Sequence, residues 1–158
     1  MAGARREGAD AYQRALGLLV RREHSRRDLT RKLAQRGVEP AEAAAAVERL
    51  AGQGYQDDQR FAESFARDRT SAGYGPVRIR VELAGHGLAE EAIAAALAAC
   101  EADWAALARR QVERRWRPAE LADPARRRKA VEFLLRRGFD QGDAWSAVRA
   151  TPDEDADL

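Results

Sequence analysis

Two adjacent aspartates, Asp57 and Asp58, are the residues whose type and spacing most suggest a catalytic or metal-binding pair. A metal ion needs more oxygen ligands than two neighbouring carboxylates supply, and the nearby sequence offers none. Both aspartates directly precede an apolar stripe of helical spacing that begins at Phe61 and Phe65. A carboxylate in that place accepts backbone N–H groups at the positive end of a helix. We therefore predict that Asp57 and Asp58 are helix caps.

The other reactive side chains give no catalytic constellation. His86 lies in a predicted turn, where we expect a solvated ring, and His24 is expected to make local contacts before the Ser25 cap. Cys100 follows an alanine-rich stretch and is interpreted as a small core residue. Neither a hydrolase-like serine, histidine and carboxylate spacing nor a glycine-rich phosphate loop occurs. The sequence predicts no catalytic residue, no metal site and no cofactor.

Composition indicates that the functional residues of this chain are positioned by helices. Alanine and arginine are abundant among the 158 residues, while glycine and proline are sparse with 12 and 5. A single cysteine fits a reducing compartment. The apolar runs are too short to span a membrane, and Arg5-Arg6 lacks the apolar stretch of an export signal. We expect an all-α, cytoplasmic protein.

A period of about fifty residues organises the chain. Three glycines, Gly37, Gly87 and Gly138, lie 50 and 51 residues apart. A leucine lies four residues before each glycine, and an apolar residue lies ten residues after it. That spacing predicts a helix, a C′ glycine and a second helix, repeated three times.

A further amphipathic stretch precedes each helix pair, so the predicted unit is a three-helix repeat. The stripes are Tyr12, Leu16, Leu19 and Val20, then Phe61, Ala62, Phe65 and Ala66, then Trp104, Leu107, Ala108 and Val112. Ser25 is predicted to cap the second helix, and Pro40, Pro76 and Pro124 suit first helical turns. The predicted organisation is a flexible N-terminus at 1–10, repeats at 11–55, 56–100 and 101–150, and an acidic tail at 151–158.

Charge is distributed unevenly over these repeats. The first and third carry +4 each, the second −2 and the tail −4, which sum to the net charge of +2. Basic blocks attract polyanions or acidic protein surfaces. Almost all the basic residues are arginines, which suit phosphate and protein interfaces alike.

Three segments resemble one known family. RREHSRRDLTRKLAQRG (Arg21–Gly37), GYQDDQRFAESFARDR (Gly54–Arg69) and GPVRIRVELAGHGL (Gly75–Leu88) are similar to the RecX family of regulatory proteins. The third unit, with FLLRRGF (Phe133–Phe139), resembles that family's C-terminal repeat. The likeness covers about residues 11–150. The stretch Arg117–Pro124 is an insertion relative to the first two units, and Ala130 replaces the larger apolar residue of the other repeats.

The resemblance implies a fold and a partner. The fold is three tandem three-helix repeats in an elongated, curved array. The partner is the RecA recombinase and its filament on single-stranded DNA, whose growth, ATPase, strand-exchange and coprotease activities such proteins limit. Some members also bind DNA weakly. A monomer without cofactor or membrane contact is expected.

Two basic clusters and one margin residue are the candidate contacts with acidic RecA surface or phosphate. The candidates are Arg21, Arg22, Arg26, Arg27, Arg31, Arg78, Arg109, Arg110, Arg114, Arg117, Arg126, Arg127, Arg128 and Lys129. Helical spacing predicts that Arg110, Arg114 and Arg117 form one outward stripe on a long helix. The alternative is that these residues only keep an alanine-rich array in solution. Trp104, Trp116 and Trp145 are expected to pack internally, although stacking on bases is the alternative.

Two other functions stay open at this point. One is a DNA-binding helical protein, because a three-helix unit can place a helix in a groove. The other is a helical-repeat scaffold for a different partner.

Overall fold

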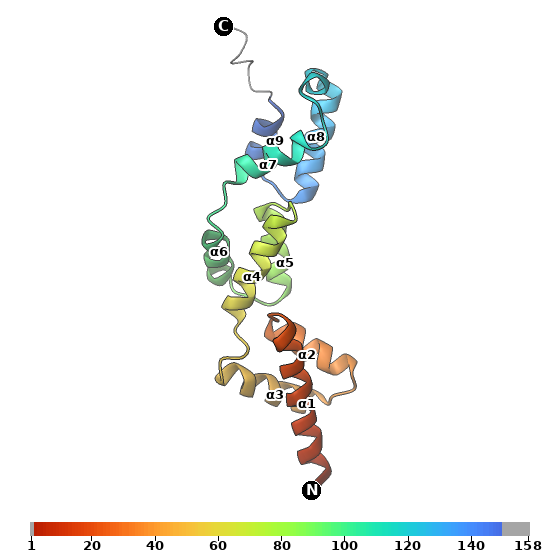
Figure 1. Ribbon diagram of the computed structural model, residues 1–158, viewed down its shortest axis with the longest axis vertical. Coiled ribbons are helices and arrows are strands. Elements are labelled where there is room, and N and C mark those ends of the chain that lie inside the picture. Colours follow the sequence, from red (N-terminus) through yellow and green to blue (C-terminus); the bar gives the residue numbers. More distant parts are fainter. Residues whose placement is uncertain (1, 150–158) are drawn as a thin grey trace. The chain divides into compact units, whose positions relative to one another are not determined.

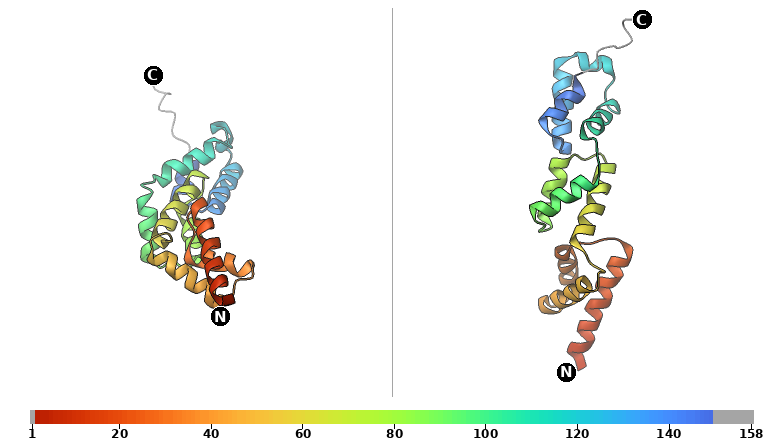
Figure 2. Two further views of the ribbon diagram at one scale, coloured as in Figure 1. Left: turned by 60° about the horizontal axis from the view of Figure 1, so that its bottom comes forward. Right: turned by 90° about the vertical axis from the view of Figure 1, so that its left-hand side faces the viewer.

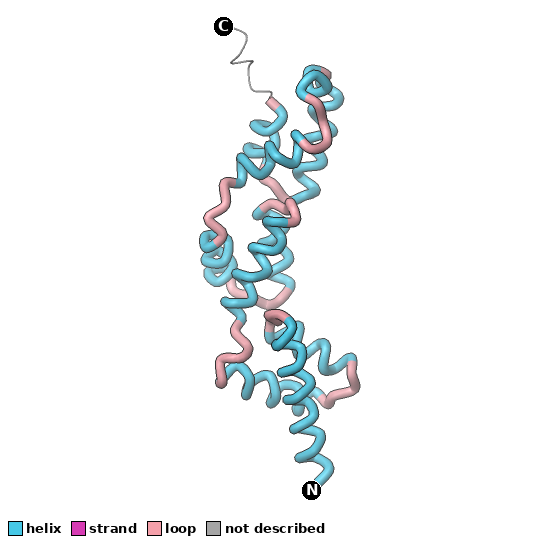
Figure 3. Tube along the Cα trace, viewed as in Figure 1, coloured by secondary structure: helices cyan, strands magenta, loops and turns pink. Residues whose placement is uncertain are grey.

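The computed structural model describes residues 2–149, and these residues form nine α-helices and one short 3-10 helix (Figures 1 and 3). The tail at 151–158 lies outside the described residues. In the first repeat the helices are α1 (Ala2–Arg21), α2 (Arg26–Gln35) and α3 (Pro40–Gly52). In the second they are α4 (Asp58–Ser71), α5 (Pro76–Gly85) and α6 (Glu90–Ala99). In the third they are α7 (Trp104–Glu113), η1 (Pro118–Ala122), α8 (Pro124–Arg137) and α9 (Gln141–Val148). The prediction of three all-α repeats is confirmed.

The helices group into two compact units that divide the middle repeat. The first unit runs up to Phe65 and takes in Leu83–Ala96, and the second takes in Ala66–Glu82 and the chain from Leu97 onward. In the first unit, α1 packs on α2 and α3, and in the second, α7 and α8 pack on α9 (Figures 1 and 2).

The repeated positions are the core positions. Leu29, Ile79 and Ala130 are fully buried in the three repeats, and so are the leucines four residues later. Ala130 is therefore a core residue despite its small side chain. The stripe predicted on α1 was wrong at one place, because Val20 is 79% exposed, while Ala11 and Ala15 are buried.

The three predicted C′ glycines adopt the left-handed backbone that ends a helix. Their φ angles are 82° at Gly37, 79° at Gly87 and 95° at Gly138. After α2, the Val38 N–H donates to the Leu33 carbonyl at 3.0 Å, and after α8, the Phe139 N–H donates to the Leu134 carbonyl at 3.1 Å. These hydrogen bonds satisfy carbonyls at the helix ends and turn the chain into the following helix.

Two segments that we did not predict to be helical contain helix. Residues 2–10, which we expected to be flexible, lie within α1, where alanines favour helix and Arg14 forms an ion pair with Asp10 at 3.2 Å. The insertion in the third repeat contains η1, whose Leu121 is buried in the core with Val131 and Phe133.

Backbone contacts join the second and third repeats inside the second unit. At the start of α5, the Gly75 N–H donates to the Arg137 carbonyl at 2.8 Å, and the Val77 N–H donates to the Gly138 carbonyl at 2.9 Å. A Cβ added to Gly138 would lie 2.6 Å from the backbone nitrogen of Arg78. The end of α8 thus caps the start of α5 at a distance that no side chain permits.

We expect Gly138→Ala to destabilise the protein more than Gly37→Ala does. Both substitutions place a Cβ on a left-handed residue, which costs about 1–2 kcal/mol. Only at Gly138 does that Cβ also collide with backbone, adding about 1–3 kcal/mol, whereas nothing lies within 4 Å at Gly37. Urea unfolding measures both losses in the free energy of unfolding. Equal losses would contradict the close approach of α8 to α5.

Candidate partner-binding surface and the junction behind it

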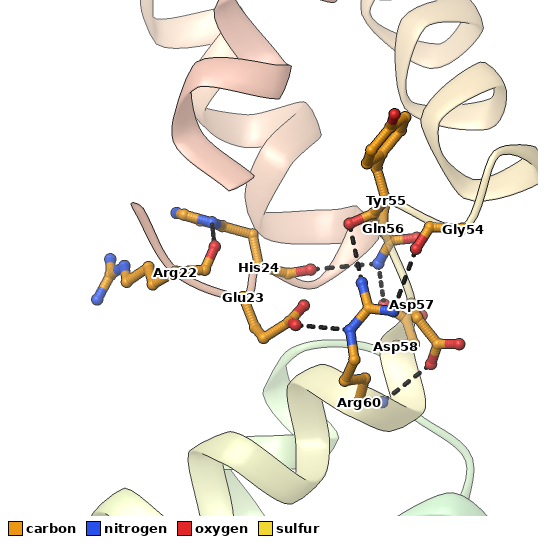
Figure 4. Close-up of polar contacts among 9 residues, drawn as sticks. All are labelled: Arg22, Glu23, His24, Gly54, Tyr55, Gln56, Asp57, Asp58 and Arg60. Carbon is orange, nitrogen blue, oxygen red and sulfur yellow. Dashed lines mark hydrogen bonds and ion pairs between the residues drawn. The ribbon is translucent and has the colours of Figure 1, made fainter. Parts of the chain in front are cut away.

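The two aspartates cap two different helices. Asp57 Oδ1 accepts the Arg60 N–H at 2.9 Å, so it caps its own helix, α4. Asp58 Oδ1 accepts the Arg26 N–H of α2 at 2.9 Å. It also accepts the Gln56 side-chain N–H at 2.9 Å (Figure 4). Asp58 therefore reaches from the second repeat to the start of the middle helix of the first.

A second set of polar contacts surrounds this cap. Gln56 Nε2 donates to the His24 carbonyl at 3.2 Å, and Gln56 is buried. Arg60 forms an ion pair with Glu23 at 2.6 Å and donates to the Gly54 and Tyr55 carbonyls at 3.1 and 3.0 Å (Figure 4). The side chain of Arg60 thereby ties the loop before α2 to the loop before α4.

His86 closes the same junction, and the expectation of a solvated ring was wrong. His86 Nδ1 lies 2.8 Å from Ser25 Oγ, and its ring packs against Phe61 and Phe65 at centroid distances of 4.7 and 5.6 Å. Burial lowers the pKa of His86 below its usual 6.5. Its place beside a turn glycine gave no sign of this contact, because the partner lies 61 residues away in the sequence.

The Ser25 and His86 pair has the distance of a nucleophile and its base but not the access. Ser25 Oγ already accepts the Asp28 N–H at 3.0 Å as the N-cap of α2, and Ser25 is fully buried. A substrate cannot reach a hydroxyl in that position. The pair therefore serves as a helix cap linked to the next repeat.

His24 makes the local contact that we expected, because its Nδ1 forms a hydrogen bond of 3.0 Å with the Arg22 carbonyl. The residue is also buried, at 2% exposure. Nε2 is buried and has no hydrogen-bond partner among residues 2–149. Burial is the main cause that lowers the pKa of His24 below 6.5.

The candidate basic residues are exposed or half-buried, and several already have internal partners. Arg26 pairs with Glu48 at 2.8 Å, Arg31 with Asp28 at 2.6 Å, and Arg78 with Glu82 at 3.1 Å. Arg126 lies 3.3 Å from Glu120. Arg78 also lies over the Tyr74 ring at 4.3 Å. These four arginines therefore make contacts within the protein as well as adding positive charge to its surface.

The remaining candidates form no ion pair with the described residues 2–149. They are Arg21, Arg22 and Arg27 in the first unit, with Arg109, Arg110, Arg114, Arg117, Arg127, Arg128 and Lys129 in the second. All are exposed except Arg127, which is half-buried. The structure thus leaves one small and one larger group of unpaired cations.

The predicted stripe along one long helix was wrong. Helix α7 ends at Glu113, so only Arg110 lies within it, while Arg114 is its C-cap and Arg117 precedes η1 in extended conformation. The chain leaves the helix where Trp116 turns inward onto the Phe133 ring, at a centroid distance of 5.5 Å. Packing of this tryptophan overrides the helical spacing of the arginines.

Two further findings concern the described residues alone. Within residues 2–149, no three or more histidine, cysteine, aspartate or glutamate side chains gather closely enough to hold a metal ion. No helix in that part of the chain combines the length and apolarity needed to cross a membrane.

Fold and surface define a tandem repeat of three-helix domains that displays unpaired arginines and joins its repeats by helix caps. Sequence models of the RecX family match all three repeats: the first three-helix domain at residues 11–50, the second at 57–97 and the third at 101–148. The chain belongs to the RecX family of regulatory proteins.

Relatives and solved structures agree with this assignment. The chain is 51% identical to the regulatory protein RecX of Xanthomonas oryzae over 95% of its own length and 94% of the relative's. It is 54% identical to that of Stenotrophomonas maltophilia, covering 90% and 87%. A crystal structure of RecX from Lactobacillus salivarius matches with a TM-score of 0.68 at 20% identity, covering 90% and 95%, and supports the fold.

We expect Asp58→Ala to lower the free energy of unfolding more than Asp57→Ala does. Loss of Asp57 removes one exposed cap, which costs about 1 kcal/mol. Loss of Asp58 leaves the Arg26 N–H without this acceptor and the buried Gln56 amide with the His24 carbonyl alone, which costs about 1–3 kcal/mol. Urea unfolding of both variants measures the difference. An equal or smaller loss for Asp58→Ala would show that this cap does not join the repeats.

Two histidines, the buried His24 and the half-buried His86, predict stability that depends on pH. Their folded pKa values lie below 6.5, so the unfolded chain takes up protons first as the pH falls. The histidines therefore add their full contribution to the free energy of unfolding above pH 6.5. That contribution declines as the pH falls below 6.5 towards the folded pKa values. We measure the drop in melting temperature from pH 7.5 to pH 5.5 for each protein. This drop should be smaller in His86→Gln than in the parent. The same fall in both would contradict a lowered pKa for His86 in the folded protein.

Proposed function

We propose that the chain binds the RecA recombinase and its filament on single-stranded DNA. By binding, it limits filament growth and lowers RecA's ATPase, strand-exchange and coprotease activities. It acts in the cytoplasm as a monomer, without a cofactor of its own. The observation that carries this proposal is membership of a family of regulatory proteins over all three repeats.

Unpaired arginines support a contact with an acidic surface. Arg109, Arg110 and Arg114 lie close in sequence at the end of α7, are exposed and form no ion pair with the described residues. Guanidinium groups pair well with carboxylates and phosphates, and exposed cations speed the approach of an anionic partner. We assign the main contact to this cluster, with Arg21, Arg22 and Arg27 as a second one.

The ATPase of RecA tests the proposal directly. The single-strand-dependent rate is titrated with this protein, and the titration is repeated with excess competing DNA. Inhibition at substoichiometric amounts that survives the competitor would support filament regulation. Inhibition that vanishes with competitor would favour a DNA-binding helical protein, and no effect at equimolar protein would favour a scaffold for another partner.

We expect Arg110→Glu/Arg114→Glu to inhibit RecA at least about tenfold less strongly, because reversing two charges at an interface costs more than 1.4 kcal/mol. The matched control is Arg67→Glu/Arg136→Glu, which changes the net charge equally at two exposed arginines outside the proposed contact. The control should inhibit nearly as well as the parent. Similar losses in both variants, with native circular dichroism, would remove the α7 cluster from the interface.

A further inference from the structure

A hollow beside Trp145 combines an exposed aromatic ring with three arginines. It has a volume of about 340 Å³ and is lined by Pro124, Arg127, Arg128, Trp145, Val148 and Arg149. We call it the Trp145 pocket. Trp145 is 39% exposed, although we expected it to pack internally. The pocket lies within the second unit, between the start of α8 and the end of α9.

The positive charge of this pocket has no counter-charge in residues 2–149. No carboxylate lines it, and Arg127, Arg128 and Arg149 form no ion pair with the described residues. Two acids that precede α8, Glu120 and Asp123, lie 3.3 and 3.9 Å from Arg126 instead. Arg127 and Arg128 also stand in the first turns of α8, where the helix dipole disfavours cations. An anionic group would relieve both effects.

A matching anionic segment follows the pocket residue Arg149 in the sequence. Arg149 lines the hollow, and the residues after it include four acids, Asp153, Glu154, Asp155 and Asp157, with no base. The four residues from Arg149 to Asp153 span at most about 14 Å when extended. A segment tethered so closely has an effective concentration on the order of millimolar, so even a low affinity suffices for occupancy.

We propose that the acidic tail, residues 151–158, folds back onto the Trp145 pocket and binds Arg127, Arg128 and Arg149 through its carboxylates. The tail then occupies the one cluster of unpaired cations that flanks an exposed tryptophan within the described residues, and it competes with acidic partners for that surface. This contact does not require RecA, and salt should weaken it, because ions screen exposed charges.

A spin label on the tail tests the contact. Leu158→Cys carries the nitroxide in a Cys100→Ser background, which keeps all four tail acids, and the indole N–H signals of the three tryptophans report proximity. At low salt the Trp145 signal should lose most of its intensity, and 1 M salt should restore it. Arg127→Gln/Arg128→Gln should also restore it, whereas the charge-matched control Arg109→Gln/Arg110→Gln should not. An unbroadened Trp145 signal, or equal broadening in both arginine variants, would overturn the proposal.

Competition is measured with a single-stranded oligothymidine as a polyanion probe. Converting the four tail acids to their amides should tighten binding about two- to tenfold, as expected when a tethered competitor is removed. That gain should disappear in the Arg127→Gln/Arg128→Gln background and persist in Arg109→Gln/Arg110→Gln. The same gain in all backgrounds would mean that the tail repels the probe by net charge alone, which would overturn the proposal.

Discussion

In the first two repeats the following repeat caps the start of the middle helix, and the array depends on this contact. The free N–H groups at a helix start need acceptors once water is excluded. For α2 these acceptors include the carboxylate of Asp58, and for α5 they are the carbonyls of Arg137 and Gly138. A three-helix repeat has a small core, so its neighbour must complete it. Stacking of repeats is therefore built into the hydrogen bonding of every middle helix that has a repeat after it.

The two junctions use the same positions with different chemistry. Ser25 and Gly75 occupy the same place before a middle helix, and His86 and Arg137 occupy the same place before a turn glycine. The first pair meets through side chains at 2.8 Å, and the second through an N–H and a carbonyl at 2.8 Å. Side-chain caps titrate and can be mutated singly, whereas a backbone contact responds only to changes of glycine. The first junction is thus the one that pH and single substitutions reach.

The features that could be predicted from the sequence are those that recur in every repeat. The turn glycines and the buried leucines meet the same backbone and packing requirements in each repeat, so they recur about every fifty residues and reveal the fold. Gln56 and His86 contact residues 32 and 61 positions away and occur in one junction only, so no period exposes them. The arginine stripe failed for a related reason. Helical spacing assumes a continuing helix, and α7 ends where Trp116 finds the Phe133 ring.

Arginine performs two tasks in this protein, and the surface cannot be interpreted without separating them. Arg60 joins two loops, and Arg137 donates to the Ala72 carbonyl at 3.4 Å while lying over Tyr74 at 4.9 Å. Substituting such residues would weaken partner binding through lost stability. Arg110 and Arg128 make no such contact within the described chain, so their substitution changes charge alone. Both kinds reach the surface, so their internal contacts distinguish them. A loss of activity identifies an interface only where the substituted arginine has no internal contact.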